Sequence, residues 1–555
     1  MDIKRTLLYI GLAAIGTLLW SQWQHEHPSQ LPKGNQPISK NVTANVAKDS
    51  KRFIPSSIKP TGQSSAIPKS KTHTTIADSQ IITVSTDVMN VEINLKTGDL
   101  VSASLPQYAI SLDQPKSPVT ILSNTSGKKY ELQSGVISSE QQPMPVTYTA
   151  SQTHFSLQPG QEQLEVNLKS TAGDLVVNKT YRFKRGEYHA SLETTVTNKG
   201  QQSWNGQWFQ QITRQNVPSS THHIRSYDGA AISTPKTPYK KVSYELMDKT
   251  PVNESITGGW IAMQQPYFVS AWVPPNTESY RYYSHVEEPQ DGTANLYTIG
   301  YLSPDWKLSA GEKKTQLTQF YIGPEIAKDL APVAPALKLT IDYGFLSPIS
   351  SIIFMIMNHI HQVIGNWGWS IILVTLCIKL LFYWPSAQSY KSMAKMRKVQ
   401  PRLQALKDRF GDDKAALSKA TMEFYRKEKV NPMGGCLPMI IQIPVFFALY
   451  YVLIESVELR QAPFILWIHD LSIKDPYYVL PILMGLSMFL QQKISPAPPD
   501  PTQAKMMMLM PVVFTVVFLS FPAGLVLYWL TNNILSIGQQ WYIMNTFNDK
   551  KKRKK

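Results

Sequence analysis

The chain has 555 residues, 43% of them hydrophobic, with a mean hydropathy of −0.19 and a formal net charge of +16. This length allows more than one domain, and a protein built only of membrane helices would be more apolar. The composition therefore excludes an all-membrane architecture and predicts a large soluble part beside a smaller membrane part. Because the basic residues cluster beside apolar segments, bilayer anchoring explains them before nucleic-acid binding does.

The first 23 residues are predicted to form an N-terminal signal-anchor transmembrane helix. Lys4 and Arg5 precede an apolar run from Thr6 to Trp20 and hold that end in the cytoplasm. A cleavable signal peptide is the alternative, but no small-x-small cleavage site follows the run, which favours an uncleaved anchor. Residues 24–78 are rich in Ser, Thr, Pro, Gln and Lys and are predicted to be a flexible linker.

Residues 79–331 have the texture of a β domain. Val91–Leu95 and Leu164–Leu168 alternate apolar and polar residues, as half-buried strands do. Turn signals such as Thr97-Gly-Asp99 and Asn198-Lys-Gly200 divide the segment into short strands. We expect a large antiparallel β-sandwich.

No residue pattern in this domain predicts chemistry. Four candidate residues lack partners at metal-binding or catalytic spacing: His222, His223, Glu287 and Glu288. The many Trp and Tyr residues could line a sugar or peptide groove, although core packing is their commoner use. The two cysteines, Cys377 and Cys436, belong to no metal or disulfide motif. We therefore expect no metal, no cofactor and no enzymatic activity.

Residues 332–362 begin with a stiff exit from Pro332 to Pro335. Apolar residues from Phe345 to Ile356 alternate with polar ones such as Ser347, and the polar Asn358 follows them. This pattern suits an amphipathic helix lying in the outer membrane interface better than a membrane span.

Residues 363–386 are predicted to form transmembrane helix 2. The stretch from Gly365 to Trp384 is long enough, because about 20 apolar residues span about 30 Å of hydrocarbon. It contains one charge, Lys379, whose long stem could snorkel to the interface. Alternatively Lys379 faces a wet cavity, since it forms one helical stripe with Thr375, Tyr383 and Ser386.

Residues 387–432 are predicted to form a basic cytoplasmic helical hairpin. A heptad-like seam steps by three and four residues, and Gly411-Asp-Asp413 breaks it before a second helix begins. The seam consists of Met396, Val399, Leu403, Leu406 and Phe410. Pro401 predicts a kink or a helix start within it.

Residues 433–543 are predicted to hold transmembrane helices 3–6, followed by a basic cytoplasmic tail at 544–555. The spans are short for a bilayer, and polar residues collect in them: Gln442, Thr515, Thr531, Asn532, Asn533 and Ser536. Together with Lys379, these residues favour the wet cavity. The Lys and Arg distribution predicts six crossings, with both termini cytoplasmic and the β domain outside.

Several motifs resemble those of the YidC membrane protein insertases of Gram-negative bacteria, within the YidC/Oxa/Alb family. They include Asn366-Trp-Gly-Trp-Ser, Lys429-Val-Asn-Pro-Met-Gly-Gly-Cys436, Trp467-Ile-His-Asp-Leu471 and Phe521-Pro-Ala-Gly-Leu-Val-Leu-Tyr528. The resemblance covers nearly the whole chain. It implies a five-helix insertase core, an N-terminal anchor and a periplasmic β-supersandwich.

The resemblance also implies a hydrophilic substrate groove, open to the cytoplasm and lipid and closed to the periplasm. The positive charge of this groove falls on Lys379, where many family members carry Arg. Thr375 and Gln442 match groove positions. Phe446 and Trp529 fall where the family contacts the passing substrate helix, although many relatives have Tyr in place of Trp529.

The implied function is insertion and folding of nascent proteins in the bacterial inner membrane, alone or with the Sec translocon. The expected partners are nascent membrane proteins, the Sec translocon, the ribosome and the phospholipid bilayer, with no small-molecule substrate. One alternative is a small-anion transporter or channel, which would predict inverted repeats that the sequence does not display. The other is a sugar- or peptide-binding module, for which a single membrane anchor would suffice.

Overall fold

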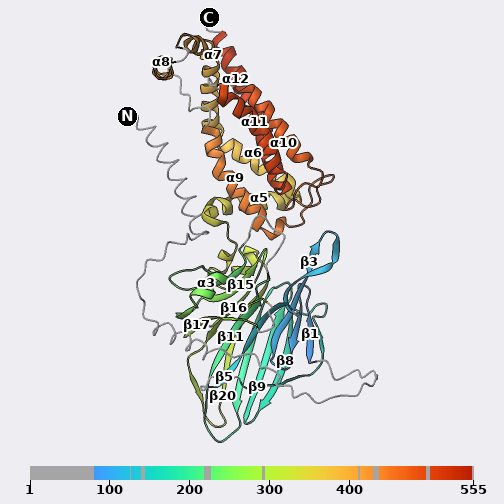
Figure 1. Cartoon of the computed structure of the whole chain (residues 1–555). Coiled ribbons are helices and arrows are strands. Elements are labelled where there is room, and N and C mark those ends of the chain that lie inside the picture. Colours follow the sequence, from blue (N-terminus) through green and yellow to red (C-terminus); the bar gives the residue numbers. More distant parts are fainter. Residues whose placement is uncertain are drawn as a thin grey trace, which may run out of the picture. The chain divides into compact units, whose positions relative to one another are not determined.

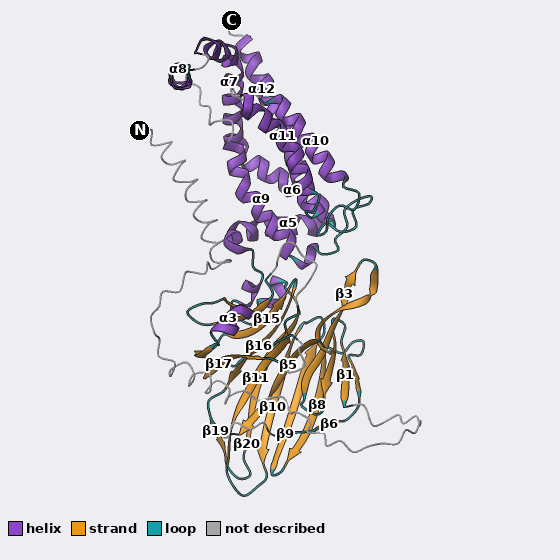
Figure 2. Cartoon of the chain, in the orientation of Figure 1, coloured by secondary structure: helices purple, strands orange, loops and turns teal. Residues whose placement is uncertain are grey.

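The structure is a computed structural model that describes residues 80–125, 127–138, 144, 146–217, 227–289, 294–410, 413–428, 437–495 and 501–552. All of these belong to one compact unit, Ile54–Lys555. The predicted anchor and linker, His222, His223 and Cys436 lie outside the described residues. Strands occupy the first part of the unit and long helices the second (Figure 2).

Two antiparallel-rich sheets form the β domain (Figure 1). Among the described residues, the first sheet has eleven strands in the order β14-β17-β18-β11-β5-β4-β3-β2-β1-β7, with β19 beside β11. Its strands are β1 (Ile81–Ser85), β2 (Asn90–Asn94), β3 (Asp99–Ser111), β4 (Gln114–Thr125), β5 (Lys128–Ser138), β7 (His154–Ser156), β11 (Trp204–Gln215), β14 (Asn253–Thr257), β17 (Ser279–Glu287), β18 (Leu296–Leu302) and β19 (Trp306–Leu308).

The second sheet has nine strands among the described residues, in the order β13-β12-β15-β16-β20-β10-β9-β8-β6. Its strands are β6 (Tyr148–Ala150), β8 (Gln163–Ala172), β9 (Leu175–Lys184), β10 (His189–Asn198), β12 (Gly229–Ser233), β13 (Lys240–Val242), β15 (Trp260–Gln265), β16 (Phe268–Val273) and β20 (Lys313–Pro324). A short helix, α3 (Tyr244–Lys249), follows β13. The expected large β-sandwich is confirmed.

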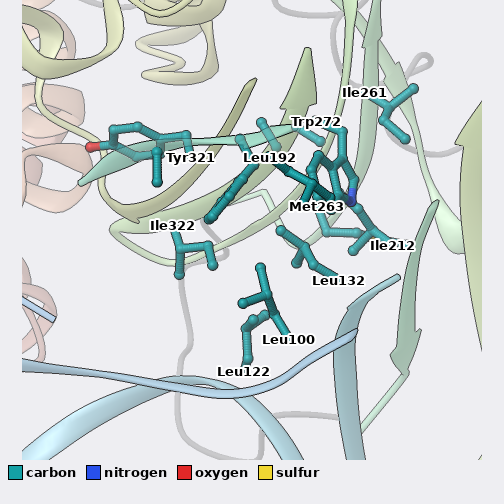
Figure 3. Close-up of a cluster of buried hydrophobic side chains, with 14 of the residues drawn as sticks. Leu100, Leu122, Leu132, Leu192, Ile212, Ile261, Met263, Trp272, Tyr321 and Ile322 are labelled. Carbon is teal, nitrogen blue, oxygen red and sulfur yellow. The ribbon is translucent and has the colours of Figure 1, made fainter. Parts of the chain in front are cut away.

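Side-chain alternation explains the two-layer packing. In β8 every second residue from Leu164 to Ser170 is buried, and the residues between them are exposed, because successive side chains of a strand point to opposite faces. The inward faces of both sheets meet in one apolar core. Figure 3 shows Leu100, Leu132 and Ile212 of the first sheet packed near Leu192 and Trp272 of the second.

One lysine lies entirely inside this core. The Lys179 amine donates to the carbonyl oxygens of Thr97, Gly98 and Ser134, at 3.3, 2.9 and 2.9 Å, and to the Ser134 hydroxyl at 3.1 Å. Burial lowers the pKa of Lys179 to about 8, and the nearby Asp99 carboxylate opposes that shift. The lysine therefore ties the turn before β3 to strand β5.

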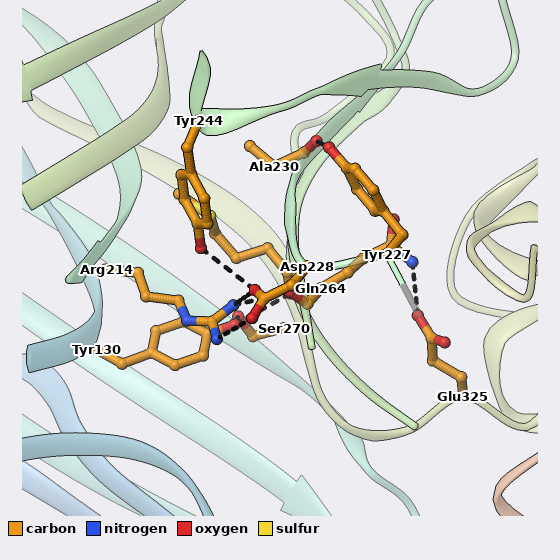
Figure 4. Close-up of polar contacts among 10 residues, drawn as sticks. Tyr130, Arg214, Tyr227, Asp228, Ala230, Tyr244, Gln264, Ser270 and Glu325 are labelled. Carbon is orange, nitrogen blue, oxygen red and sulfur yellow. Dashed lines mark hydrogen bonds and ion pairs between the residues drawn. The ribbon is translucent and has the colours of Figure 1, made fainter. Parts of the chain in front are cut away.

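A polar cluster joins β11, β12 and β15 (Figure 4). The Arg214 guanidinium donates to both oxygens of Asp228, at 2.6 and 3.3 Å, and to the Gln264 carbonyl at 2.8 Å. The Gln264 amide in turn donates to Glu325 at 2.8 Å and to the Thr340 carbonyl at 2.9 Å. These residues satisfy one another, so the cluster is a structural connection between the sheets and the segment after β20 that contains Thr340.

The exit from the β domain packs on its core. Helix α4 (Ala327–Leu330) and the 3-10 turn η1 (Leu337–Thr340) bury Leu330 and Leu337 in the core cluster of the sandwich. A second 3-10 turn, η2 (Gly344–Leu346), leads into helix α5 (Ser347–Ile364). Helix α5 buries Ile353 and Met357 and exposes Ile352 and Met355, so apolar residues occupy both of its sides.

The remaining helices form the second part of the unit. They are α6 (Trp367–Leu381), α7 (Tyr383–Phe410), α8 (Lys414–Lys427), α9 (Leu437–Glu455), α10 (Val479–Ile494), α11 (Pro501–Phe518) and α12 (Ala523–Lys552), with the 3-10 turn η4 (Val457–Leu459) after α9. Helix α12 packs against α10 and α6. It continues to Lys552, so the described part of the predicted basic tail is helical.

The expected continuous helical stripe from Thr375 to Ser386 is wrong, because the helix is interrupted at Phe382. Helix α6 ends at Leu381 and α7 starts at Tyr383, with a bend of 69° between them. Pro385 is the cause we assign, since its ring excludes the Leu381 carbonyl from a helical bond. Among the described helices, none is long and apolar enough to cross a membrane alone, whereas the bent pair α6–α7 meets that test together.

Two helices, α7 and α8, occupy the segment for which a hairpin is predicted. Helix α7 ends at Phe410 and α8 begins at Lys414, and the seam residues Val399 and Leu403 are buried. Arg402 forms an ion pair with Glu428 at 3.0 Å between the two arms. Pro401 neither begins nor interrupts α7, which runs through it.

Candidate functional site

Helix α6 is held at its start by the loop after α9. The Asn366 side chain accepts a hydrogen bond from the Trp369 amide at 3.1 Å, as an N-cap residue does, and donates to the Phe464 carbonyl at 3.1 Å. A side chain at Gly368 would collide with the Phe464 ring. Glycine at this position lets the loop and helix approach closely, which sets the direction of α6 and of the residues that follow on it.

Lys379 points toward helix α12. Its amine donates to the Ser536 hydroxyl at 2.7 Å, and Ser536 donates to the Asn532 carbonyl at 2.6 Å. Lys379 is half-buried, and among the described residues no carboxylate lies within ion-pair distance of it. An amine that snorkelled to the interface would be solvated instead, so the contact with Ser536 favours the inward-facing alternative.

Thr375 lies one turn before Lys379 but does not project a free hydroxyl. It is 1% exposed, and its hydroxyl donates to the Ile371 carbonyl of its own helix at 2.6 Å. This back-bonding is common for threonine inside helices and leaves only the hydroxyl oxygen as an acceptor. The expected role of Thr375 in a groove therefore stays a prediction.

Gln442 connects α9 to α12. Its side-chain amide donates to the hydroxyl of Tyr528, a tyrosine that is fully buried. One turn further along α9, Phe446 meets Trp529 edge to face, with 4.8 Å between ring centroids and 90° between planes. The structure thus brings Gln442 and Phe446 onto neighbouring residues of α12.

Trp529 is the centre of an aromatic cluster. Its ring lies 5.5 Å from that of Phe518 and 6.3 Å from that of Phe514, both on α11. The Trp529 indole nitrogen is buried and has no hydrogen-bond partner among the described residues. A buried donor without a partner costs about 1–3 kcal/mol, so this nitrogen is available to an acceptor that enters the cluster.

Helix α12 unites these contacts in a column, which we define as Tyr528, Trp529, Asn532, Ser536 and Gln540. Tyr528 and Ser536 are eight residues apart, or about 12 Å along a helix that rises about 1.5 Å per residue. The predicted residues therefore form two groups: Gln442, Phe446 and Trp529 at one level, and Lys379 at the other.

Sequence reasoning named Asn532 and Ser536 only as polar residues in a span and did not single out Tyr528 or Gln540. The spacing 528, 532, 536, 540 was the available signal, because residues four apart share a helix face. The side-chain carbonyl oxygens of Asn532 and Gln540 are buried without a partner in the described structure. Unsatisfied acceptors of this kind are suited to water or to a passing polar chain.

The chemistry of this column is that of a binding surface. Its own residues offer amide and hydroxyl groups, and the neighbouring helices add the Lys379 amine and the aromatic rings around Trp529. Within the described residues no cluster of three or more His, Cys, Asp or Glu side chains could hold a metal ion. Such a surface can attract a carboxylate and replace water around a polar segment.

The C-terminal part of the chain, residues 359–551, matches the family model described as "60Kd inner membrane protein", and residues 81–356 match "YidC periplasmic domain". A membrane protein insertase YidC of Coxiella burnetii (strain Dugway 5J108-111) is 50% identical, covering 100% of this chain and 98% of the relative. One from Legionella pneumophila (strain Lens) is 45% identical, with 100% and 99% covered, and one from Pseudomonas putida is 44% identical, with 98% of each covered. Since these matches span the whole chain at high identity, the chain belongs to the family of YidC membrane protein insertases.

Proposed function

We propose that this insertase places inner-membrane proteins in the bilayer by using the α12 column as a polar path beside the lipid. A nascent segment with a short polar N-terminal tail docks from the cytoplasm. Lys379 and Gln442 take the place of water around the tail, with the hydroxyl oxygen of Thr375 as a further acceptor, while Phe446 and Trp529 contact the apolar segment that follows. The protein forms no covalent bond with its substrate and uses no cofactor.

The contact between Lys379 and Ser536 is the observation that carries this proposal. A charge inside an apolar helix costs about 2.5–3.5 kcal/mol on the insertion scale. The amine nevertheless turns toward α12, and no described carboxylate neutralises it. A positive group kept without a counter-ion is suited to attracting a negative group that arrives with the substrate.

The energy for release comes from the substrate. Its apolar segment gains about 25 cal/mol for each Å² removed from water, so transfer into lipid is favourable once the polar tail has crossed. Short helices help in the same process, since α10 has 16 residues, or about 24 Å of helix. Helices of this length thin the bilayer locally and shorten the path of the tail.

Both termini lie in the cytoplasm, the β domain lies in the periplasm, and the α7–α8 hairpin extends into the cytoplasm. Its basic outer faces are available to the ribosome, and the Sec translocon is a second partner for longer substrates. The Lys and Arg asymmetry of the loops supports this orientation.

Reconstitution tests the proposal. The purified protein in liposomes should protect the translocated tail of a single-span substrate from added protease, and empty liposomes should not. A photo-reactive residue in place of Phe446 should cross-link the substrate during insertion. The matched control is a photo-reactive residue in place of Phe489, which is also aromatic but lies on α10. No protection above that of empty liposomes, or equal cross-linking at both positions, would contradict the proposed path.

A further inference from the structure

The loop between α9 and α10 contains a five-residue segment, Leu471–Asp475, that joins two helix starts. Its carbonyl groups accept hydrogen bonds from the first two amides of α12: Ala523 donates to Ile473 at 2.7 Å and Gly524 donates to Leu471 at 2.9 Å. Lys474 forms an isolated antiparallel bridge with Pro522. The amides at a helix start have no partner in their own helix, so this segment supplies what α12 lacks.

Asp475 caps the start of α10 in the same way. Its carboxylate accepts hydrogen bonds from the backbone amides of Leu480, at 2.7 Å, and Tyr477, at 3.0 Å, and from the Trp467 indole at 3.0 Å. The side chain is 1% exposed. A buried carboxylate at a helix start is stabilised both by the amides and by the helix dipole.

The backbone beside Asp475 is held in an uncommon conformation. Tyr478, which precedes α10, has a φ of 58°, in the left-handed region that only glycine adopts freely. The bonds from Asp475 to the residues on both sides of Tyr478 stabilise this turn. Loss of the carboxylate therefore removes the support of a strained turn as well as a cap.

This segment lies where the three helices of the site come together. A side chain at Gly524 would lie 3.0 Å from Leu453 of α9, 3.1 Å from the Leu471 carbonyl and 3.3 Å from Ile371 of α6. Ile371, Leu453 and Leu471 are all 0% exposed. Gly524 precedes Tyr528 by one helical turn, so a dry, tightly packed region borders the α12 column at this end.

We infer that Leu471–Asp475 is a latch that closes one end of the α12 column, with Asp475 as its positioning residue. The latch holds the starts of α10 and α12 together, and it keeps α6, α9 and α12 in contact at Gly524. In the orientation of the proposed function, on which this inference rests, the closed end faces the periplasm. Opening of the latch would let water and ions enter the column from that side.

Cysteine labelling tests the latch. Both native cysteines, Cys377 and Cys436, are first replaced by serine in the full-length protein. A single reporter, Val374→Cys, then replaces a fully buried residue of α6, about one turn after Ile371. A membrane-impermeant maleimide is added to right-side-out or to inverted membrane vesicles, without substrate, and the rate of labelling is measured.

With the latch intact, we expect very slow labelling from the periplasmic side. Asp475→Ala should raise that rate about tenfold or more, because local opening controls access to a buried thiol, and labelling from the cytoplasmic side should change little. The matched control is Asp470→Ala. Asp470 is also buried in this loop, but in the described structure its carboxylate accepts hydrogen bonds from the amide and hydroxyl of Ser472 and from neither helix start.

A second variant covers the case in which Asp475→Ala does not accumulate. Trp467→Phe removes only the indole donor to Asp475, and it should give a smaller rise in periplasmic labelling. Equal rates for Asp475→Ala and Asp470→Ala, or no rise in Trp467→Phe, would overturn the latch. Labelling needs no substrate, so the two proposals can fail separately. A protein that inserts no substrate, but whose periplasmic labelling still rises with Asp475→Ala, would refute the proposed function and support the latch.

Discussion

Lys379→Leu provides the most direct test of the column as an insertion path. The change removes a hydrogen bond from a charged donor, worth about 1.5–3 kcal/mol, and also a charge whose placement in an apolar helix costs about 2.5–3.5 kcal/mol. These terms nearly cancel, and Ser536 keeps its bond to the Asn532 carbonyl. We therefore expect the free energy of unfolding to change by no more than about 1 kcal/mol.

The effect on insertion should depend on the charge of the substrate tail. At a separation of about 6 Å and an effective dielectric constant of about 20, a protonated amine and a carboxylate attract by about 2.8 kcal/mol, or about 100-fold in rate. Lys379→Leu should lower insertion of a tail with one aspartate by up to this factor. The same tail with asparagine should lose much less, because hydration by Gln442 remains.

The assay is protease protection in proteoliposomes at matched protein levels, with both tails and four proteins: wild type, Lys379→Leu, Lys379→Arg and Lys379→Glu. Arginine keeps the charge and should be tolerated, whereas glutamate should reverse the preference between tails. Lys391→Leu, which removes an exposed lysine from α7, controls for lost positive charge. Wild-type insertion of both tails by Lys379→Leu would refute the reasoning and leave Lys379 outside the mechanism.

Three further changes test other parts of the chain. Trp529→Ala should lower insertion and reduce the free energy of unfolding by about 3 kcal/mol, because it removes the central ring of the aromatic cluster. Trp529→Tyr should retain insertion. Thermal unfolding measures the stability of both variants, and the insertion assay measures their activity. Leu403→Asp should destabilise the hairpin by about 3–5 kcal/mol, since it buries an unpaired charge, whereas Arg402→Ala should cost at most about 1 kcal/mol. Limited proteolysis of the hairpin measures this difference. Equal sensitivity of the two variants to protease would contradict a packed seam. Lys179 has a pKa of about 8 in the folded state and 10.5 when solvated. Between these two pH values the unfolded state binds more protons than the folded state. The free energy of unfolding should therefore rise from pH 8 to pH 10.5. That rise, measured by urea unfolding of the intact protein in detergent, should be absent from Lys179→Met; parallel pH profiles would contradict the assignment.

The order and type of the main segments could be predicted from the sequence. Alternating residues such as those of β8 mark strands wherever they fold, because a strand turns every second side chain to the same face. The heptad-like spacing of Val399 and Leu403 likewise predicted the buried face of α7. The motifs that carry the family resemblance are also local, and the comparisons with full-length relatives confirm that resemblance.

The limits of this reasoning appear at Phe382 and Thr375. The apolar run through residues 365–384 predicts one helix, but Pro385 ends it early, and the polar stripe is divided between α6 and α7. The hydroxyl of Thr375 bonds to its own helix, a contact that periodicity does not predict. At Phe382 the proline ring outweighs periodicity, because it prevents a backbone hydrogen bond.

The partners of the site residues were decided only by the tertiary structure. Lys379 and Ser536 are 157 residues apart and Gln442 and Tyr528 are 86 apart, yet each pair forms a hydrogen bond. The sequence marked Lys379, Gln442 and Ser536 as polar residues in an apolar setting, and so in need of a partner. Which partner it finds depends on how α6, α9 and α12 pack around glycines such as Gly368 and Gly524, where the absence of a side chain sets the distance between elements. Packing of this kind joins residues distant in the chain, and no local pattern records it.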